Sequence, residues 1–126
     1  MYNKGKEISN KLTKKRKASK LSKGEYRIAS FLGKECITFY REFYINGLYG
    51  KYGHYLYFDF YIPEYNLAIE FDGVFHYEKA NERQKENDFR KVAYCKKNGL
   101  NLLRIKYTEY ENIENLILAK IDRIAK

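Results

Sequence analysis

The alternation of hydrophobic and polar residues divides the chain into seven predicted elements after a polar N-terminal stretch. Apolar residues at helical spacing indicate helices, whereas short runs rich in β-branched and aromatic residues indicate strands. The pattern predicts, in order, a helix over 22–33, strands over 36–45, 54–62 and 67–71, a helix over 78–98, a strand over 100–107 and a helix over 109–125. Ser22 followed by Glu25 has the spacing of a capping box, Thr108 is the predicted cap of the last helix, and Gly99 is a helix-stop signal.

The order of these elements predicts an α/β domain built on a mixed four-stranded sheet. The first three strands follow one another without a helix, so they can pair as a meander. The fourth strand follows a helix, so it returns through a right-handed crossover and lies parallel to a strand already in place. Helices are then expected on both faces of the sheet. Residues 22–126 suffice for one domain, and residues 1–21 are expected to form a basic, flexible N-terminal arm.

The hairpin of the second and third predicted strands carries the acidic residues. Its turn begins at Pro63, whose ring fixes φ. Side chains alternate between the two faces of a strand, so Glu70 and Asp72 share a face, and Asp59 on the neighbouring strand can come beside them. Three carboxylates at one end of a hairpin repel one another unless a cation lies between them, and oxygen ligands suit Mg²⁺. The alternative is a solvated acidic face without a metal.

Three further polar residues are candidates for the same site. His76 follows the hairpin, where a histidine can act as general acid or base near neutral pH; the alternative is an exposed loop histidine. Asp88 lies at the edge of the face that the helix 78–98 is predicted to bury. Glu25 either completes the capping box or reaches the site from the first turn of its helix. The apolar stripe predicted for the helix 78–98 consists of Phe89, Val92 and Ala93, with Cys95 at its end.

The positive charge of the chain lies almost entirely in its first 23 residues. The whole chain carries +9; residues 1–23 hold nine Lys or Arg and one acid, giving +8, and the remaining 16 basic and 15 acidic residues give +1. Such blocks often bind polyanions, and nucleic acid is the expected partner; the alternative is a solubilising tail. The residues expected to contact nucleic acid are Lys14, Lys15, Arg16, Lys17 and Lys20 in the arm and Lys51 in a glycine-rich loop.

Membrane and secretory features are absent from the sequence. No apolar run approaches the roughly 18 residues that a membrane span needs, and the basic N-terminus lacks the apolar segment of a signal peptide. Cys36 and Cys95 are far apart and lack metal-ligand spacing, so reduced thiols are expected. These features predict a cytoplasmic protein without a membrane partner, as a monomer or homodimer.

The element order and the acidic residues together resemble the PD-(D/E)xK, or restriction-endonuclease-like, nuclease superfamily. Its pattern is an Asp on the second strand and (Asp/Glu)-x-Lys on the third; Asp59 matches the first position, Glu70 the second, and Asp72 stands where the lysine is expected. The closer resemblance is to the Vsr-type (very-short-patch-repair) endonucleases and their phage and homing relatives. The motif EFDGxxHY after a DFYxP strand carries it, and the resemblance covers residues 22 to about 118.

This resemblance implies a restriction-endonuclease-like core and the activity of a Mg²⁺-dependent DNA endonuclease, in which Mn²⁺ substitutes for Mg²⁺. It implies that Asp59 and Glu70 are metal ligands and that Asp72 is either a ligand or a partner of the ligands. DNA is the implied partner, and phosphodiester hydrolysis is the implied reaction. The alternatives are a catalytically inactive nucleic-acid-binding module on the same fold and an enzyme of another class, because a fold does not fix a function.

The remaining residues of the implied catalytic constellation come from three different segments. Glu25 is the acid of the first helix, His76 is the loop histidine that acts as acid or base, and Asp88 orients His76 or a water molecule. The motif lysine is missing, so the activation of the attacking water is expected to pass to His76. Lys91 and Lys106 are the alternatives for that role.

Overall fold

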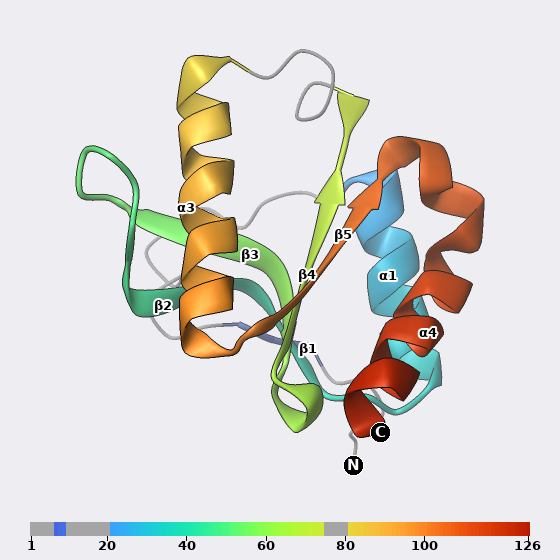
Figure 1. Ribbon diagram of the computed structural model, residues 1–126. Coiled ribbons are helices and arrows are strands. Elements are labelled where there is room, and N and C mark those ends of the chain that lie inside the picture. The colour runs from blue at the N-terminus through green and yellow to red at the C-terminus, as the bar shows by residue number, and fades with distance from the viewer. Residues whose placement is uncertain (1–6, 10–20, 75–80) are drawn as a thin grey trace.

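A mixed β-sheet lies between helices on both of its faces (Figure 1). The structure is a computed structural model that describes residues 7–9, 21–74 and 81–126. Its elements are β1 (Glu7–Ser9), α1 (Lys23–Lys34), β2 (Phe39–Tyr49), β3 (Tyr55–Ile62), β4 (Leu67–Asp72), α3 (Glu82–Asn98), β5 (Asn101–Lys106) and α4 (Ile113–Ala125), with 3-10 turns η2 (Pro63–Tyr65) and η3 (Tyr107–Asn112). None of the helices in the described part of the chain is long and apolar enough to cross a membrane.

The sheet is five-stranded in the order β1-β2-β3-β4-β5. β2 pairs antiparallel with β3 and β3 antiparallel with β4, whereas β4 pairs parallel with β5 after the crossover through α3. The predicted meander, crossover and helices on both faces are therefore confirmed. The predicted number of four strands is corrected to five, because Glu7–Ser9, which the sequence placed in the arm, pairs parallel with the start of β2.

The two faces of the sheet have separate hydrophobic cores. One face packs against α1 and α4 through a cluster centred on Leu32, Phe60, Ile69 and Ile117. The other face packs against α3 through a smaller cluster, which includes Cys95 of that helix. Figure 1 shows the same division, with α3 on one side of the strands and α1 and α4 on the other.

Local sequence signals set most of the element boundaries. Ser22 and Glu25 form the predicted capping box, and Gly99 ends α3 with a φ of 69°. In the hairpin turn, Asn66 adopts the left-handed conformation with a φ of 47°. This conformation costs Asn less than most residues, so the turn after Pro63 closes as the sequence predicts.

Several predicted boundaries differ from those in the structure: β3, β4 and β5 differ by one residue at one or both ends, and the larger differences are at β2, α3 and α4. β2 begins at Phe39 and continues to Tyr49 through a register shift, so the predicted loop over 46–53 is shorter. The first helix continues one residue past Gly33, to Lys34. α3 begins at Glu82, because Asn81 is extended and caps it, and the predicted helical residues 78–80 lie outside the described ranges. Thr108 does not cap the last helix, because it lies inside η3 and α4 starts after Asn112.

The start of α1 packs directly on the end of β4. The ring of Phe71 lies so close to Gly24 that a Cβ atom at position 24 would overlap it. Gly24 is buried, and Phe71 belongs to the core on the α1 and α4 face. Because Glu25 follows Gly24, this contact brings the acid of α1 toward the strand ends.

Candidate acidic site at the divergence of two strands

The acidic residues meet where β3 and β4 stop pairing through their backbones. The backbone pairing of β3 with β4 covers Phe60 to Ile62 on β3, and Asp59 directly precedes this paired stretch. There, the Asp59 carboxylate accepts a hydrogen bond from the backbone N–H of Phe71 at 2.8 Å. The Glu70 carboxylate accepts one from the backbone N–H of Asp59 at 3.1 Å. Each carboxylate thus bonds to the opposite strand, which fixes both acids at one place.

The electrostatic surroundings of Asp59 oppose its ionisation. Burial raises the pKa of Asp59 well above its usual value, and the negative charges of Glu70 and Glu25 raise it further. The Phe71 N–H and the Lys91 ammonium act in the opposite direction and do not compensate. A positive charge placed beside Asp59 would therefore favour its carboxylate form.

A buried lysine of α3 forms an ion pair with one of these two acids, Glu70. The Lys91 Nζ lies 3.1 Å from the Glu70 Oε1, and the two side chains are 11% and 4% exposed. The same ammonium group lies 5.5 Å from the centre of the Phe58 ring. The basic partner of the Glu70 carboxylate is therefore a lysine of α3 and not a residue of β4. Lys106, the other alternative named from the sequence, is exposed.

A second group of charges joins β4, β5 and α3. Arg104 Nη2 lies 3.0 Å from Asp72 Oδ2 and 3.2 Å from Asp88 Oδ2. Burial alone would lower the pKa of Arg104, but the charges of Asp72 and Asp88 raise it above its usual value. Arg104 is not among the site residues predicted from the sequence. The feature that brings Arg104 to the site is the parallel pairing of β4 with β5, in which Arg104 lies opposite Glu70.

The structure brings together five of the six predicted catalytic residues. Asp59 and Glu70 are bonded to each other's strands, Asp72 and Asp88 share Arg104, and Glu25 both completes its capping box and acts on Asp59 through its charge. The residues that lie outside the described ranges are His76 and the arm residues Lys14, Lys15, Arg16, Lys17 and Lys20.

The buried face of α3 differs from the prediction. Phe89 is 69% exposed, whereas Lys91 and Cys95 are the buried residues of the helix. The predicted stripe assumed that the largest apolar residue faces the sheet. α3 instead turns Lys91 toward the Glu70 carboxylate and Asp88 toward Arg104, because burial of the acids requires positive partners.

The carboxylates suit a hard cation by their chemistry, although two of them already have basic partners. Among residues 21–74 and 81–126, no group of three or more His, Cys, Asp or Glu side chains converges in an arrangement that could hold a metal ion. Glu70 and Asp72 are bonded to Lys91 and Arg104. The surroundings of Asp59 oppose its ionised form, so a cation placed beside it would favour that form.

Comparisons with protein-family models, with curated proteins and with solved structures find no match for this chain. The fold and the site define an α/β protein whose buried acids lie at the split between two antiparallel strands and are bonded by lysine and arginine from the neighbouring elements. The function has to be inferred from this geometry and from the charge of the chain.

Proposed function

We propose that this chain is a metal-dependent DNA endonuclease on a restriction-endonuclease-like core. The observation that carries the proposal is the reciprocal bonding of Asp59 and Glu70 at the split between β3 and β4, with Lys91 on Glu70. An acid pair with an adjacent lysine is suited to phosphodiester hydrolysis, in which charge develops on phosphate oxygens. The basic N-terminal residues supply a complementary charge for DNA.

Asp59 and Glu70 are the residues that would hold Mg²⁺, or Mn²⁺ in its place. The bound ion would polarise the phosphate and make water easier to deprotonate. Asp59 is suited to this role because its carboxylate form requires a nearby positive charge. Arg104 bonds to Asp72 and Asp88, so these acids support the site by fixing β4 and α3 relative to β5.

Lys91 takes the place of the motif lysine in this proposal, and His76 remains the proposed acid or base. The Lys91 ammonium, on Glu70, can bind a phosphate oxygen or orient the attacking water. Replacing His76 with Ala should reduce the cleavage rate by roughly 100-fold. An unchanged rate in that variant, with a lost rate after Lys91→Met, would assign proton transfer to the Lys91 side of the site.

A cleavage assay tests the function directly. The full chain is incubated with labelled duplex, mismatched, flap and junction DNA, with Mg²⁺ and with EDTA. Cleavage is expected only with the metal and should be lost in Asp59→Ala, whereas DNA binding persists. Asp122→Ala is the matched control, because that aspartate is 73% exposed on α4. Full cleavage in EDTA or by Asp59→Ala would refute the metal mechanism.

The second candidate function is a nucleic-acid-binding module without catalytic activity. It is favoured by the ion pairs of Lys91 with Glu70 and of Arg104 with Asp72, which already neutralise two acids of the site. Isothermal calorimetry with Mg²⁺ and Mn²⁺ separates the two candidates. Heat of metal binding that disappears in Asp59→Ala supports the nuclease. DNA binding with no metal binding supports the module.

The proposed DNA contact of the basic segment predicts a steep salt dependence. The logarithm of duplex affinity falls with the logarithm of salt at about −0.9 per phosphate contact, so replacing four contacting cations should flatten the slope by up to about 3.6. The variant replaces Lys14, Lys15, Arg16 and Lys17 with Gln, which leaves β1 in place. The control replaces Lys96, Lys97, Arg123 and Lys126. Equal slopes in the two variants would contradict contact by the arm.

A further inference from the structure

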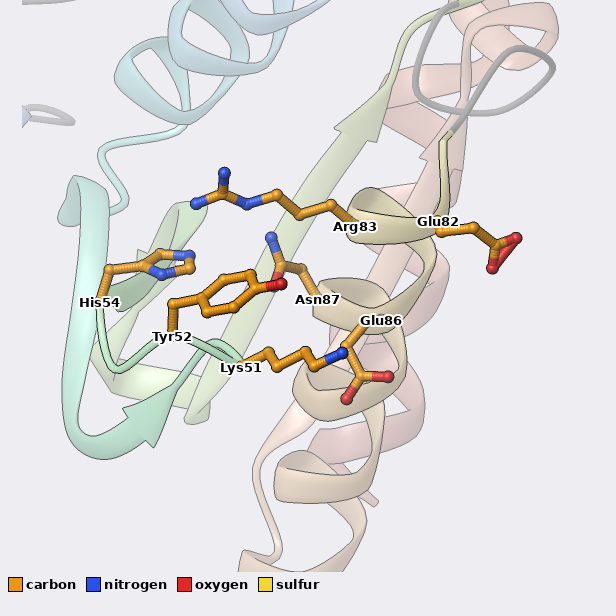
Figure 2. Close-up of a pocket in the computed structure, with 7 residues that line it drawn as sticks. All are labelled: Lys51, Tyr52, His54, Glu82, Arg83, Glu86 and Asn87. Atoms are coloured by element: carbon orange, nitrogen blue, oxygen red, sulfur yellow. The ribbon is translucent and has the colours of Figure 1, made fainter.

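A cavity of about 460 Å³ lies between the β2–β3 loop and the first turns of α3 (Figure 2). Its lining residues are Lys51, Tyr52 and His54 from the loop and Glu82, Arg83, Glu86 and Asn87 from α3. Figure 2 shows Arg83 reaching across the cavity toward His54, with Tyr52 and Asn87 between them and Glu82 pointing away. The cavity is distinct from the acidic site but shares α3 with it.

Tyr52 gives the cavity an exposed aromatic surface flanked by two cations. Its side chain is 73% exposed. The Lys51 Nζ lies 5.8 Å and the Arg83 Cζ 5.7 Å from the centre of its ring. An exposed ring with adjacent cations is the combination that binds unpaired nucleotides, because the base stacks on the ring and the cations attract the phosphate.

The acidic residues of the cavity are paired with cations of their own helix. Glu86 Oε2 lies 2.7 Å from Arg90 Nε, and Glu82 Oε2 lies 3.9 Å from Lys85 Nζ. Within the part of the chain that the structure describes, Lys51 and Arg83 are not in an ion pair with a carboxylate. The charge available to a ligand is therefore positive, which favours an anionic group such as a phosphate.

The floor of the cavity is formed by His54 and Asn87, which both pack against Gly50. The Asn87 Oδ1 is buried and accepts no hydrogen bond from any described residue. The His54 ring packs on Gly50, where a Cβ atom would overlap it, and Asn87 lies against the same glycine. The absence of a side chain at Gly50 thus leaves room for the imidazole and orders the floor of the cavity.

The cavity and the acidic site adjoin each other along α3. Asn87 directly precedes Asp88, and Lys91 follows one helical turn later. Arg83 lies one turn before Asn87, so the cavity lies beside the N-terminal part of α3 and the acidic site lies beside the middle of that helix. A nucleotide in the cavity would therefore be near, along the same DNA strand, to a phosphate at Asp59 and Glu70.

We propose that this cavity binds one unpaired nucleotide of a DNA substrate beside the phosphate that is cut. The base stacks on Tyr52, and its phosphate contacts Lys51 and Arg83. The position beside a scissile phosphate rests on the proposed nuclease function, but the binding of an unpaired nucleotide does not require cleavage. The inferred substrate is thus DNA with a flap, gap or bulge rather than fully paired duplex.

The experiment measures binding of the full chain to two DNAs in EDTA, so that cleavage does not interfere. One DNA is fully paired, and the other has the same sequence with a three-nucleotide flap carrying 2-aminopurine. The full chain should prefer the flap DNA and quench 2-aminopurine. Tyr52→Ala and Arg83→Ala should each weaken flap binding by about 5- to 100-fold and leave duplex binding within about two-fold. Tyr52→Phe should keep the preference, because phenylalanine also stacks.

Matched controls and the opposite outcome make the test decisive. Phe89→Ala removes an exposed aromatic of α3 outside the cavity, and Arg123→Ala removes an exposed cation of α4; both should bind like the parent chain. Equal weakening of flap and duplex binding by Tyr52→Ala, or no weakening, would overturn the nucleotide cavity. A flap preference without cleavage in Mg²⁺ would refute the nuclease and retain the cavity. Cleavage without a flap preference would refute the nucleotide cavity and retain the nuclease.

Discussion

The two faces of the sheet bury different kinds of side chain. The face toward α1 and α4 buries apolar residues such as Phe60 and Ile69. The face toward α3 has a smaller apolar cluster and carries the buried charges of Glu70, Asp72 and Lys91. Apolar burial stabilises a fold, whereas buried charges are unfavourable unless they are paired. The difference indicates that the first face supplies most of the stability that allows the second to hold a charged site.

The largest expected effect belongs to the apolar face. Phe60 is fully buried and makes an edge-to-face contact with Phe39, with 5.6 Å between ring centres. Phe60→Ala should lower the free energy of unfolding by about 3–5 kcal/mol, measured by urea denaturation. Phe89→Ala, at a position 69% exposed, is the control and should change it by less than about 0.5 kcal/mol. Similar losses in the two variants would contradict the contrast between the faces.

The next effect tests the ion pair on the α3 face. Lys91→Met leaves the Glu70 carboxylate buried without its ammonium partner, so it should lower the free energy of unfolding by about 3 kcal/mol. Adding Glu70→Gln removes the unpaired charge and should restore most of that loss. The two single variants and the double variant form a cycle, measured by urea denaturation. A double variant as unstable as Lys91→Met would show that the loss comes from packing instead of charge.

A smaller effect of opposite sign is expected at Asp59. The raised pKa means that folded Asp59 binds its proton more tightly than the unfolded chain does, so stability falls as pH rises from about 4 through the folded pKa. Asp59→Asn should therefore be more stable than the parent at pH 7–8. The gain should vanish below about pH 4. Thermal unfolding against pH measures it, with exposed Asp122→Asn as control; parallel curves for parent and Asp59→Asn would contradict it.

The two cysteines differ in burial and therefore report how firmly α3 packs on its face of the sheet. Cys95 is buried on the α3 face, and burial raises the pKa of its thiol to about 11, with the Glu70 charge adding to the rise. Cys36 is exposed. Iodoacetamide at pH 7.5 should therefore modify Cys36 in the folded chain and Cys95 only after unfolding, because the thiolate is the reactive form. Mass spectrometry of the labelled peptides detects the difference, and early labelling of Cys95 would show that α3 detaches readily.

The parts of the fold that the sequence predicted depend on local signals. The capping box of Ser22 and Glu25 and the turn after Pro63 need only a few neighbouring residues, and the structure confirms both. β1 escaped prediction because a three-residue strand inside a lysine-rich segment has no pattern of its own. Its pairing with β2 depends on the sheet that forms elsewhere in the chain.

The same distinction applies to the site. The proximity of Asp59 and Glu70 follows from one hairpin, so alternation along two strands predicted it. Arg104 meets Asp72 only through the register of β4 with β5, which the sequence does not display. Lys91 faces Glu70 because α3 is oriented so that these two charges pair. Apolar spacing alone predicted that Phe89 faces the sheet, whereas it is exposed.

The contact between Gly24 and Phe71 constrains how this chain can evolve. Any side chain at position 24 would displace the ring or the start of α1. A change at either position therefore needs a compensating change at the other, and the two positions are expected to co-vary in homologous chains. Because Glu25 follows Gly24 directly, this fit also fixes where the acid at position 25 lies relative to Asp59. A small residue before the first-helix acid, paired with an aromatic after Glu70, is then a sequence signature by which distant relatives can be recognised.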